Sequence, residues 1–348
     1  MASPSPSYTV LVTGSSGHLG AALMLTLPSQ GHAPLGIDIL PSETTTIVGS
    51  ITDRPLVASI LSQNPSISHI IHAATLHKPH VESHPKSAFI DTNITGTLVL
   101  LEEAAASLPP SRIKSFIFVS TTSTFGGALS PKPGQPAAWI DESVVPVPKN
   151  IYGATKCAAE DLCALAHRQS SLPVLVLRTS RFFPEADDDE DRRAAMADAN
   201  LKVCELAYRR ADIADVVSAV ACGMAKAGDI GFGKYIVSAP PPFSRTDDSG
   251  GGGETLLRRL DADAGAVFRE AVPGCAAVFE KLGWRFLERL DRVYDSSKAV
   301  RDLGWRPEWT FEQVVERLGR GEDWRSELTH RVGKRGYHAV PTGVYTTR

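Results

Sequence analysis

Two side chains that could move a proton stand four residues apart, Tyr152 and Lys156. In a helix this spacing places both on one face, about one turn apart. A phenol titrates near about 10, which makes it a poor base at neutral pH. A neighbouring ammonium favours the phenolate and lowers that pKa. Because such pairs also occur by chance, the interpretation depends on the segments that position them.

The most informative of these segments is a glycine-rich turn near the start of the chain. Residues 8–12 form a short, apolar, β-branched run, typical of a buried parallel strand. Gly14, Gly17 and Gly20 follow at three-residue spacing, and residues 21–27 are predicted to be helical. Glycines let the backbone approach a pyrophosphate, and the helix start offers amide donors and a positive dipole end. The alternative, an ordinary tight turn, fits this strand–turn–helix position less well.

An acidic residue follows at the distance that a dinucleotide site requires. Asp38 ends a second apolar run, about twenty residues beyond the glycines, where it could accept hydrogen bonds from the adenosine ribose hydroxyls. Its charge would repel a 2′-phosphate, which favours NAD over NADP. The alternative is a solvated aspartate in a turn. With NAD bound, the cationic nicotinamide ring would join Lys156 in lowering the pKa of Tyr152, while a hydride moves to or from the ring.

Polar and small residues recur at the ends of later predicted strands. Residues 67–72 lead into Ala73, Ala74 and Thr75, whose size allows close approach of a flat ring. Residues 115–120 lead into a run of hydroxyl side chains from Thr121 to Thr124. Hydroxyls at the carboxyl end of a parallel strand face the crevice where ligands bind in open α/β sheets. His72, beside a strand, is interpreted as a packed residue.

The remaining pattern predicts an α/β protein with a doubly wound parallel sheet, the Rossmann arrangement, and a smaller C-terminal substrate-binding region. Helices are predicted at 93–108, 151–167 and 213–225, and strands at 174–177 and 233–238, with Asp53 capping another helix. Residues 131–148 are predicted to be a long loop and 254–289 mostly helical. We expect the dinucleotide-binding domain at 1–180, with 211–239 returning to it, the substrate region at 181–210 and 240–330, and a tail at 331–348.

Composition excludes several classes of partner. The chain has 348 residues, 43% hydrophobic and 22% charged, with a net charge of -3. This balance gives no electrostatic reason to expect nucleic acid or a membrane surface as a partner. No run approaches the ~20 apolar residues of a membrane span, and no signal segment is evident. The five scattered cysteines, with no Cys-x-x-Cys, indicate a reduced, cytoplasmic protein. The acidic run 187–191 is interpreted as a solvated loop, and no metal site is expected.

Together these motifs resemble the extended short-chain dehydrogenase/reductases, the NAD-dependent epimerase/dehydratase family, over about residues 8–320. The resemblance rests on the glycine turn, Asp38, the segment 72–74, Asn93 with Gly96 and Thr97, the segment 121–126, the Tyr152/Lys156 pair, and the segments 295–299 and 303–307. It implies cofactor contacts from Gly14, Gly17, His18, Leu19, Gly20, Asp38, Ile39, Ser50, Ile51, Ala73, Ala74, Thr75, Asn93, Tyr152, Lys156 and Ser180.

The resemblance also implies a catalytic triad of Thr121, Tyr152 and Lys156. Phe125-Gly126 stands where family members carry Tyr-Gly, and this anchor places Thr121 at the family's Ser/Thr position. Tyr152 would be the acid/base, Thr121 would bind the reacting oxygen, and Lys156 would hold the nicotinamide ribose. The alternative for Thr121 is a strand-end threonine that only bonds backbone.

The chain departs from the family pattern at the expected substrate side. Dehydratases carry Asp-Glu after the catalytic threonine, whereas Thr122 and Ser123 stand here, which argues against elimination of water. Thr121 and Thr122 are candidate substrate contacts. Arg181 stands near a family asparagine and is either a clamp for a substrate anion or the partner of nearby acids. Arg209 and Arg210 lie close to a diphosphate-binding arginine position, and Arg210 is the second candidate.

We therefore expect an NAD-dependent epimerase or oxidoreductase acting on a hydroxyl of a sugar-like, anionic substrate. The alternatives are a simple dehydrogenase that releases its ketone and exchanges its cofactor, and a non-catalytic NAD-binding sensor. The resemblance suggests a homodimer packed through the helices that carry Asn93 and Tyr152. Trp284 and Trp305 are predicted to be packing residues, and residues 336–338 could contact a partner or cap the site.

Overall fold

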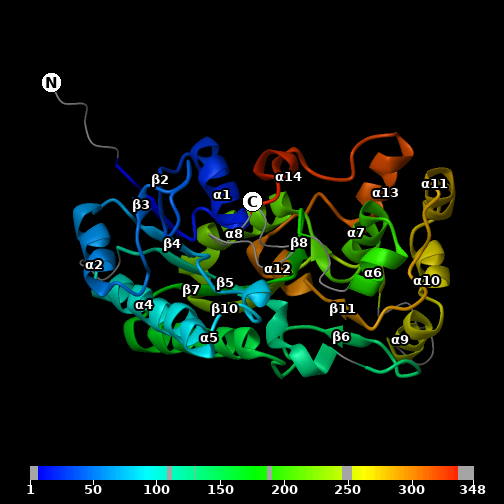
Figure 1. Cartoon of the computed structure of the whole chain (residues 1–348), viewed down its shortest axis with the longest axis horizontal. Helices are drawn as coiled ribbons and strands as arrows, with labels where there is room; N and C mark the ends of the chain where they lie inside the picture. Colours follow the sequence, from blue (N-terminus) through cyan, green and yellow to red (C-terminus); the bar gives the residue numbers. More distant parts are fainter. Residues whose placement is uncertain (1–6, 108–111, 130, 186–189, 245–252, 336–348) are drawn as a thin grey trace.

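A seven-stranded parallel sheet runs through the centre of the larger part of the molecule (Figure 1). The computed structural model describes residues 7–107, 112–129, 131–185, 190–244 and 253–335. The strands lie in the spatial order β10 (Phe232–Val237), β7 (Val174–Thr179), β5 (Ser115–Thr121), β4 (His69–His72), β1 (Val10–Thr13), β2 (Pro34–Asp38) and β3 (Ile47–Val48). The chain moves outward from β1 to β3, then crosses to the other side of β1 and moves outward again. This order confirms the predicted doubly wound fold and places its switch point between β1 and β4.

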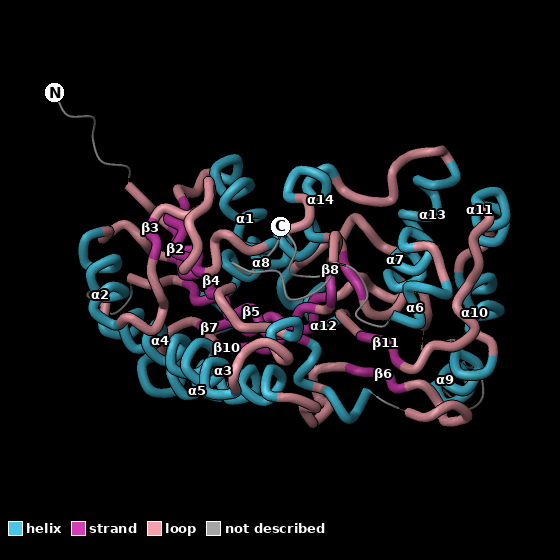
Figure 2. Tube along the Cα trace, in the orientation of Figure 1, coloured by secondary structure: helices cyan, strands magenta, loops and turns pink. Residues whose placement is uncertain are grey.

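Side chains alternate along the strands and feed two cores, one on each face of the sheet. Val10 and Val12 of β1 face a core with α1 (His18–Thr26), α8 (Ile213–Ile230) and α12 (Ser297–Leu303). Leu11 faces the opposite core with α2 (Arg54–Gln63), α4 (Gly96–Ala106) and α5 (Ile151–Ser170). Figure 2 shows the helices around the strand layer. The near-continuous apolar strands of the sequence are explained by burial on both faces.

Side-chain caps fix where the long helices begin. Asp53 accepts from Leu56 N at 3.0 Å at the start of α2, which confirms its predicted role. Asn150 accepts from Gly153 N at 3.1 Å at the start of α5. Each cap satisfies an amide that has no partner within the first helical turn. The cap at Asn150 therefore determines the position of Tyr152 in the first turn of α5.

The helix predicted from Asn93 begins earlier than its pattern indicates. Pro85 precedes α3 (Lys86–Phe89), which continues through a π-helical segment (Ile90–Thr95) into α4. The wider π turn breaks the 3.6-residue period, and exposed polar residues within it conceal the continuity. The segment predicted to be one helix from 93 to 108 is thus the second half of a longer, irregular one.

A smaller region packs beyond the carboxyl edge of the sheet. The predicted loop at 131–148 contains β6 (Ala138–Ile140), which pairs in parallel with β11 (Arg292–Tyr294), so the loop prediction was wrong there. A three-residue strand is too short to show a period, and its partner lies far away in sequence. β8 (Arg181–Phe182) pairs with β9 (Arg210–Ala211). The helices of this region are α6 (Glu190–Ala195), α7 (Asp198–Leu206), α9 (Gly253–Ala262), α10 (Ala264–Ala271), α11 (Cys275–Leu282) and α13 (Phe311–Gly319).

The last part of the chain returns to the large sheet. Trp305 is fully buried in the core beneath α8 and donates from Nε1 to Asp215 O at 3.0 Å, as its predicted packing role requires. A final helix, α14 (Glu327–Val332), packs on α1 and α8 (Figure 1). Residues 336–348, with the candidate segment 336–338, and most of the acidic run at 187–191 lie outside the described residues.

Candidate active site

The three predicted catalytic side chains meet at the carboxyl end of β5. Thr121 ends β5, and Tyr152 and Lys156 occupy the first two turns of α5 on its buried face. Gly153 makes this approach possible, because a Cβ there would lie 2.8 Å from Ser123 O. The start of α5 thus packs directly against the turn that follows Thr121.

Thr121 is oriented to donate toward Tyr152. Its Oγ1 accepts a hydrogen bond from Ser123 N at 3.0 Å, which leaves its own proton free to be donated. Burial raises the pKa of Tyr152 above its usual range, the Thr121 hydrogen bond lowers it, and the charge of Glu185 raises it further. A donor that lowers a phenol's pKa stabilises the phenolate, so Thr121 favours loss of the Tyr152 proton.

Lys156 is a buried amine with a weakened hold on its proton. Burial lowers its pKa to about 7. Its Nζ donates to Val119 O at 2.6 Å and lies 4.1 Å from the centroid of the Phe118 ring. In the protein alone, burial raises the pKa of Tyr152. The lowering that the sequence predicts requires bound NAD as well as Lys156, and it stays a prediction.

The glycine turn fits tightly between β1 and β4. Gly14 has φ +72°, and a Cβ on it would lie 2.7 Å from Ala74 N. Gly20 packs α1 against the same turn, since its Cβ would meet Gly14 O at 1.9 Å. Gly17 is the N-cap of α1, with no side-chain hydrogen bond. The backbone amides at this helix start are therefore covered neither by a side chain at Gly14 nor by a capping side chain at Gly17.

Asp38 lies against the glycine turn, where a ribose-binding acid is expected. Its Oδ2 accepts from Ser16 N at 3.1 Å and its Oδ1 from Leu40 N at 2.9 Å. Beside it, Ile39 is 64% exposed, an unusual position for an isoleucine and one suited to packing against a ligand ring. On the neighbouring segment, Ser50 hydroxyl pairs with Thr52 at 2.8 Å, and Ile51 is buried against Gly96.

Asn93 ties the loop after β4 to the catalytic helix. Its Oδ1 accepts from the Thr75 hydroxyl and from Leu76 N, both at 2.9 Å. Its Nδ2 donates to Leu76 O at 2.9 Å and to the Thr155 hydroxyl at 3.0 Å. Asn93 is buried, and these bonds use its amide on both sides. The structure thus gives Asn93 a positioning role between the loop at 73–76 and α5.

His72 is a packing residue, as predicted. Its two ring nitrogens pair with the Thr13 and Thr97 hydroxyls at 2.8 and 2.9 Å, and burial keeps its pKa well below the usual value. At the glycine turn, Leu19 contributes its side chain to the core around α8. Ser180, which follows β7, is buried, with its amide bonded to Val237 O at 2.9 Å.

The candidate substrate residues occupy different environments. Thr122 is buried and its hydroxyl bonds to Tyr294. Arg181 is half-buried, and its charge acts on the Glu185 carboxyl. Arg210 is fully buried, with Nε donating to Glu205 Oε2 at 2.7 Å and Nη1 to Glu185 O at 2.7 Å. The Arg210 guanidinium is held inside the protein, and this geometry does not support a substrate role. The predicted substrate contact of Arg210 therefore stays a prediction.

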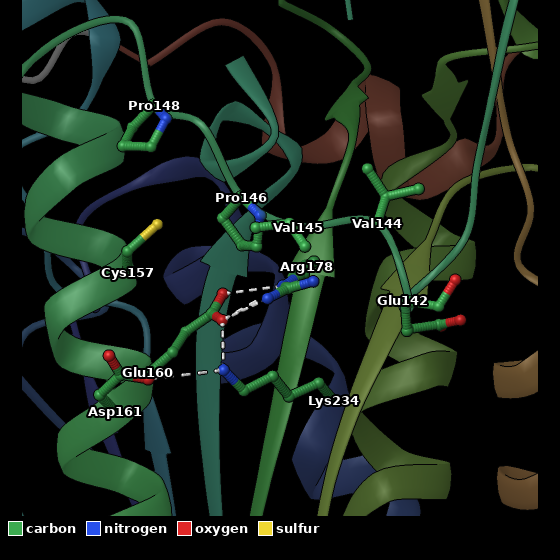
Figure 3. Close-up of a pocket in the computed structure, with 11 residues that line it drawn as sticks. Glu142, Val144, Val145, Pro146, Pro148, Cys157, Glu160, Asp161, Arg178 and Lys234 are labelled. Carbon is green, nitrogen blue, oxygen red and sulfur yellow. Dashed lines mark hydrogen bonds and ion pairs between the residues drawn. The ribbon is translucent and has the colours of Figure 1, made fainter. Parts of the chain in front are cut away.

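Sequence reasoning missed Glu160, which lies one turn beyond Lys156 on α5. Glu160 pairs with Arg178 of β7 at 2.7 Å and accepts from the Ser120 hydroxyl at 2.6 Å. Lys234 of β10 approaches the same carboxylate at 3.0 Å. Glu160, Arg178 and Lys234 line a cavity of about 460 Å³. Figure 3 shows the three side chains together, with Glu142 on the other side. A third residue at four-residue spacing, after Tyr152 and Lys156, was the signal that could have found it.

Sequence reasoning also missed the pair of His18 and Glu185. His18 Nδ1 lies 3.6 Å from Glu185 Oε1, which brings the segment after β7 to the start of α1. Burial raises the pKa of Glu185, and the charges of Arg181, Arg210 and Lys202 oppose that rise. Because its charge also acts on Tyr152, Glu185 faces both the glycine turn and the catalytic trio.

Residues 10–222 match the model of the NAD dependent epimerase/dehydratase family. The chain belongs to this family. It is 31% identical over 192 residues to UDP-glucose 4-epimerase of Rhizobium leguminosarum bv. trifolii, a match that covers 53% of this chain and 54% of that one. It is 27% identical over 345 residues to dTDP-glucose 4,6-dehydratase of Xanthomonas campestris pv. campestris, covering 88% and 91%.

Solved structures of the family confirm the fold. UDP-glucose 4-epimerase of Thermotoga maritima, determined with UDP-glucose, superimposes with a TM-score of 0.56 at 20% identity, covering 90% of this chain and 99% of that one. UDP-glucuronic acid 4-epimerase of Bacillus cereus, in complex with UDP-glucuronic acid and NAD, gives 0.56 at 18%, covering 88% and 96%. The assignment to the NAD dependent epimerase/dehydratase family confirms the prediction of an NAD-dependent enzyme.

The residues at the switch point fit NAD. The backbones of Gly14 and Ala74 lie so close that a side chain at residue 14 would not fit. The amides at the start of α1 suit a diphosphate, and Asp38 suits a ribose. Among the described residues there is no cluster of three or more candidate metal ligands, and no described helix is long and apolar enough to cross a membrane.

Proposed function

We propose that this protein is an NAD-dependent epimerase or dehydrogenase that oxidises, and in an epimerase re-reduces, a hydroxyl of a sugar-like substrate with Tyr152 as the acid/base. The observation that carries the proposal is the joint position of Thr121, Tyr152 and Lys156 beside the switch-point crevice. The proposal extends to the predicted cofactor contacts around Gly14 and Asp38. A homodimer and a cytoplasmic location remain predictions.

The roles follow from how each proton is held. Thr121 accepts from Ser123 N and donates toward Tyr152, so it stabilises the phenolate and can bind the reacting oxygen of the substrate. Tyr152 then takes the hydroxyl proton of the substrate and returns it after the reverse transfer. Lys156 uses one N–H on Val119 O, which leaves two donors for the cofactor ribose. NAD, when bound, supplies the hydride acceptor.

The surroundings of Thr122 support epimerisation or simple oxidation over dehydration. Thr122 and Ser123, the two residues after Thr121, carry hydroxyls and no carboxyl. The Thr122 hydroxyl bonds to Tyr294, and the Ser123 amide donates to Thr121. Elimination of water requires an acid and a base at the departing groups. The relative that acts as a 4,6-dehydratase is therefore a poorer guide to this chain than the epimerases.

The proposed substrate carries an anionic group. Arg181 lies two residues after the end of β7. Its side chain is half-buried, and its charge acts on the Glu185 carboxyl. A guanidinium at the wall of a crevice can bind a carboxylate or phosphate through two parallel hydrogen bonds. Relatives named for UDP-glucose, dTDP-glucose and UDP-glucuronate make such nucleotide sugars the first candidates, and UDP-glucuronate adds a carboxylate.

Denaturing release of nucleotide from the freshly purified protein, identified by mass spectrometry, tests the proposal first. NAD retained in near-equal amount to the protein supports a cofactor recycled in place, as in an epimerase. Weak, reversible NAD binding supports a dehydrogenase that exchanges its cofactor at each turnover. A protein that binds no NAD, retained or added, contradicts the proposed function.

A further inference from the structure

The segment 326–335, here called the C-terminal strap, is fixed at its first end to a buried carboxylate. Asp212 is fully buried and accepts from Ser326 N at 3.0 Å, from the Ser326 hydroxyl at 2.5 Å and from the Thr329 hydroxyl at 3.0 Å. Asp212 also caps α8 through Ala214 N at 2.8 Å. The strap therefore begins from a rigid point in the sheet domain.

The other end of the strap is attached to the glycine turn. His18, the first residue of α1, accepts a hydrogen bond at Nε2 from Arg335 N at 2.7 Å and also bonds to the backbone of Gly333. Between the two ends, Val332 packs in the same core cluster as Leu19. The strap thus packs on α1 and reaches the glycine turn that is predicted to bind the cofactor.

This attachment places two cations beside the start of α1. His18 is 4% exposed, and burial together with the charges of Arg335 and Lys334 lowers its pKa to about 3, so the imidazole is neutral. The first turn of α1 contains no acidic residue. Lys334 is exposed and Arg335 half-buried. The Nδ1 atom of His18 lies 3.6 Å from Glu185 Oε1.

We propose that the strap retains the cofactor, with Lys334 and Arg335 binding the diphosphate of NAD at the start of α1 and with His18 holding the strap in place. The inference rests on the proposed function, because it requires NAD in the glycine turn. A diphosphate carries negative charge that the helix dipole and amides balance only in part. Cations delivered from the far end of the chain complete that balance and must move before the cofactor leaves.

The test compares release of NAD from paired variants of the full chain. Lys334→Ala/Arg335→Ala removes the two cations that the strap places beside His18. Lys226→Ala/Arg168→Ala removes one lysine and one arginine from exposed positions on α8 and α5, outside the strap. Release is followed by the loss of NADH fluorescence after a chase with excess NAD, and affinity by calorimetry with NAD. We expect the strap variant to bind NAD about tenfold more weakly and the control to match the wild type.

His18→Phe tests the attachment itself. Phenylalanine keeps a ring in the buried position but removes the acceptor for Arg335 N, so we expect faster NAD release without loss of the fold. Thermal unfolding without NAD checks that the fold is kept. Higher salt should reduce the difference in the rate of NAD release between the strap variant and the wild type, because salt screens exposed charges.

Three outcomes separate the claims. Faster release from the strap variant and from His18→Phe, with the control unchanged, supports the inference. Equal release from wild type, strap variant and control overturns it while leaving the proposed function intact. A wild type that binds no NAD overturns the proposed function, and the strap inference with it.

Discussion

Glu160 of α5 and Arg178 of β7 form a buried ion pair, with 2.7 Å between Oε2 and Nη2. Glu160 also accepts from the Ser120 hydroxyl, next to Thr121. Lys234 brings β10 into the same cluster at 3.0 Å. Through this one carboxylate α5 is joined to β5. Figure 3 shows its contacts with Arg178 of β7 and Lys234 of β10. The pair therefore fixes the helix that carries Tyr152 and Lys156 against the strand that carries Thr121.

Replacing Glu160 with glutamine should destabilise the protein by about 3–5 kcal/mol at pH 7, because Arg178 is left buried without its counter-charge. Burial opposes ionisation of Glu160, but Arg178, Lys234 and Ser120 outweigh it, so the pKa of Glu160 is lowered. The stabilisation is thus present above the unfolded pKa of about 4.3 and is lost as pH falls through the lower folded value. Urea unfolding at a series of pH values measures it.

The control for that prediction is the next residue along α5. Asp161 also faces Lys234, at 3.9 Å, but its side chain is 84% exposed. Asp161→Asn should leave the free energy of unfolding unchanged. Equal losses from Glu160→Gln and Asp161→Asn, or a loss at Glu160 that does not shrink at low pH, would show that the buried pair is not the cause.

Gly14→Ala should abolish NAD binding and destabilise the fold. The new Cβ would lie 2.7 Å from Ala74 N, at a residue with φ +72°. Gly31 separates the two causes, because it has φ +83° with nothing within 4 Å of its Cβ position. Gly31→Ala should cost only the backbone strain, about 1–2 kcal/mol, and keep NAD binding. NAD binding that survives Gly14→Ala would contradict the tight fit at the switch point.

Asp38→Asn should lower the preference for NAD over NADP. The carboxylate lies beside Ser16 N, where it would accept from a ribose hydroxyl and repel a 2′-phosphate. Calorimetric titration with both dinucleotides measures the ratio of the two dissociation constants. Wild-type protein that binds NADP more tightly than NAD would refute the role given to Asp38.

Arg181→Ala should raise KM for an anionic substrate by about tenfold or more, with little change in kcat, because the lost contact holds substrate and transition state alike. The competing role is a structural pair with Glu185, whose carboxyl Arg181 faces. The double variant Arg181→Ala/Glu185→Gln distinguishes them. Recovery of KM in the double variant would assign Arg181 to that pair, whereas a KM that stays high assigns it to the substrate.

Much of the cofactor side of this site could be predicted from local sequence. Short motifs contain Gly14, Asp38, Tyr152 and Lys156, and the spacing within each motif predicts where these residues lie in the fold. The residue type of Asp53 alone predicts the start of its helix. The sequence pattern did not predict the π turn at Asn93 or the strand β6, because an irregular helix and a three-residue strand show no detectable period.

The pairs between residues far apart in the sequence could not be predicted, for a different reason. Glu160 meets Arg178 and Lys234, and His18 meets Arg335, only because the sheet and the C-terminal strap bring distant segments together. The raised pKa of Tyr152 in the protein alone also depends on how deeply the phenol is buried and on Glu185 nearby. Such quantities require coordinates.

The central claim is that Tyr152 moves the proton while a hydride is transferred. The most direct measurement compares Tyr152→Phe with Tyr235→Phe, a change at a tyrosine of β10 in the sheet core. Both are assayed for NADH formation or for epimerisation, with UDP-glucose, UDP-glucuronate and dTDP-glucose. We predict that Tyr152→Phe loses about 10²- to 10⁴-fold in kcat while still binding NAD, and that Tyr235→Phe keeps wild-type turnover. Wild-type turnover by Tyr152→Phe would contradict the account.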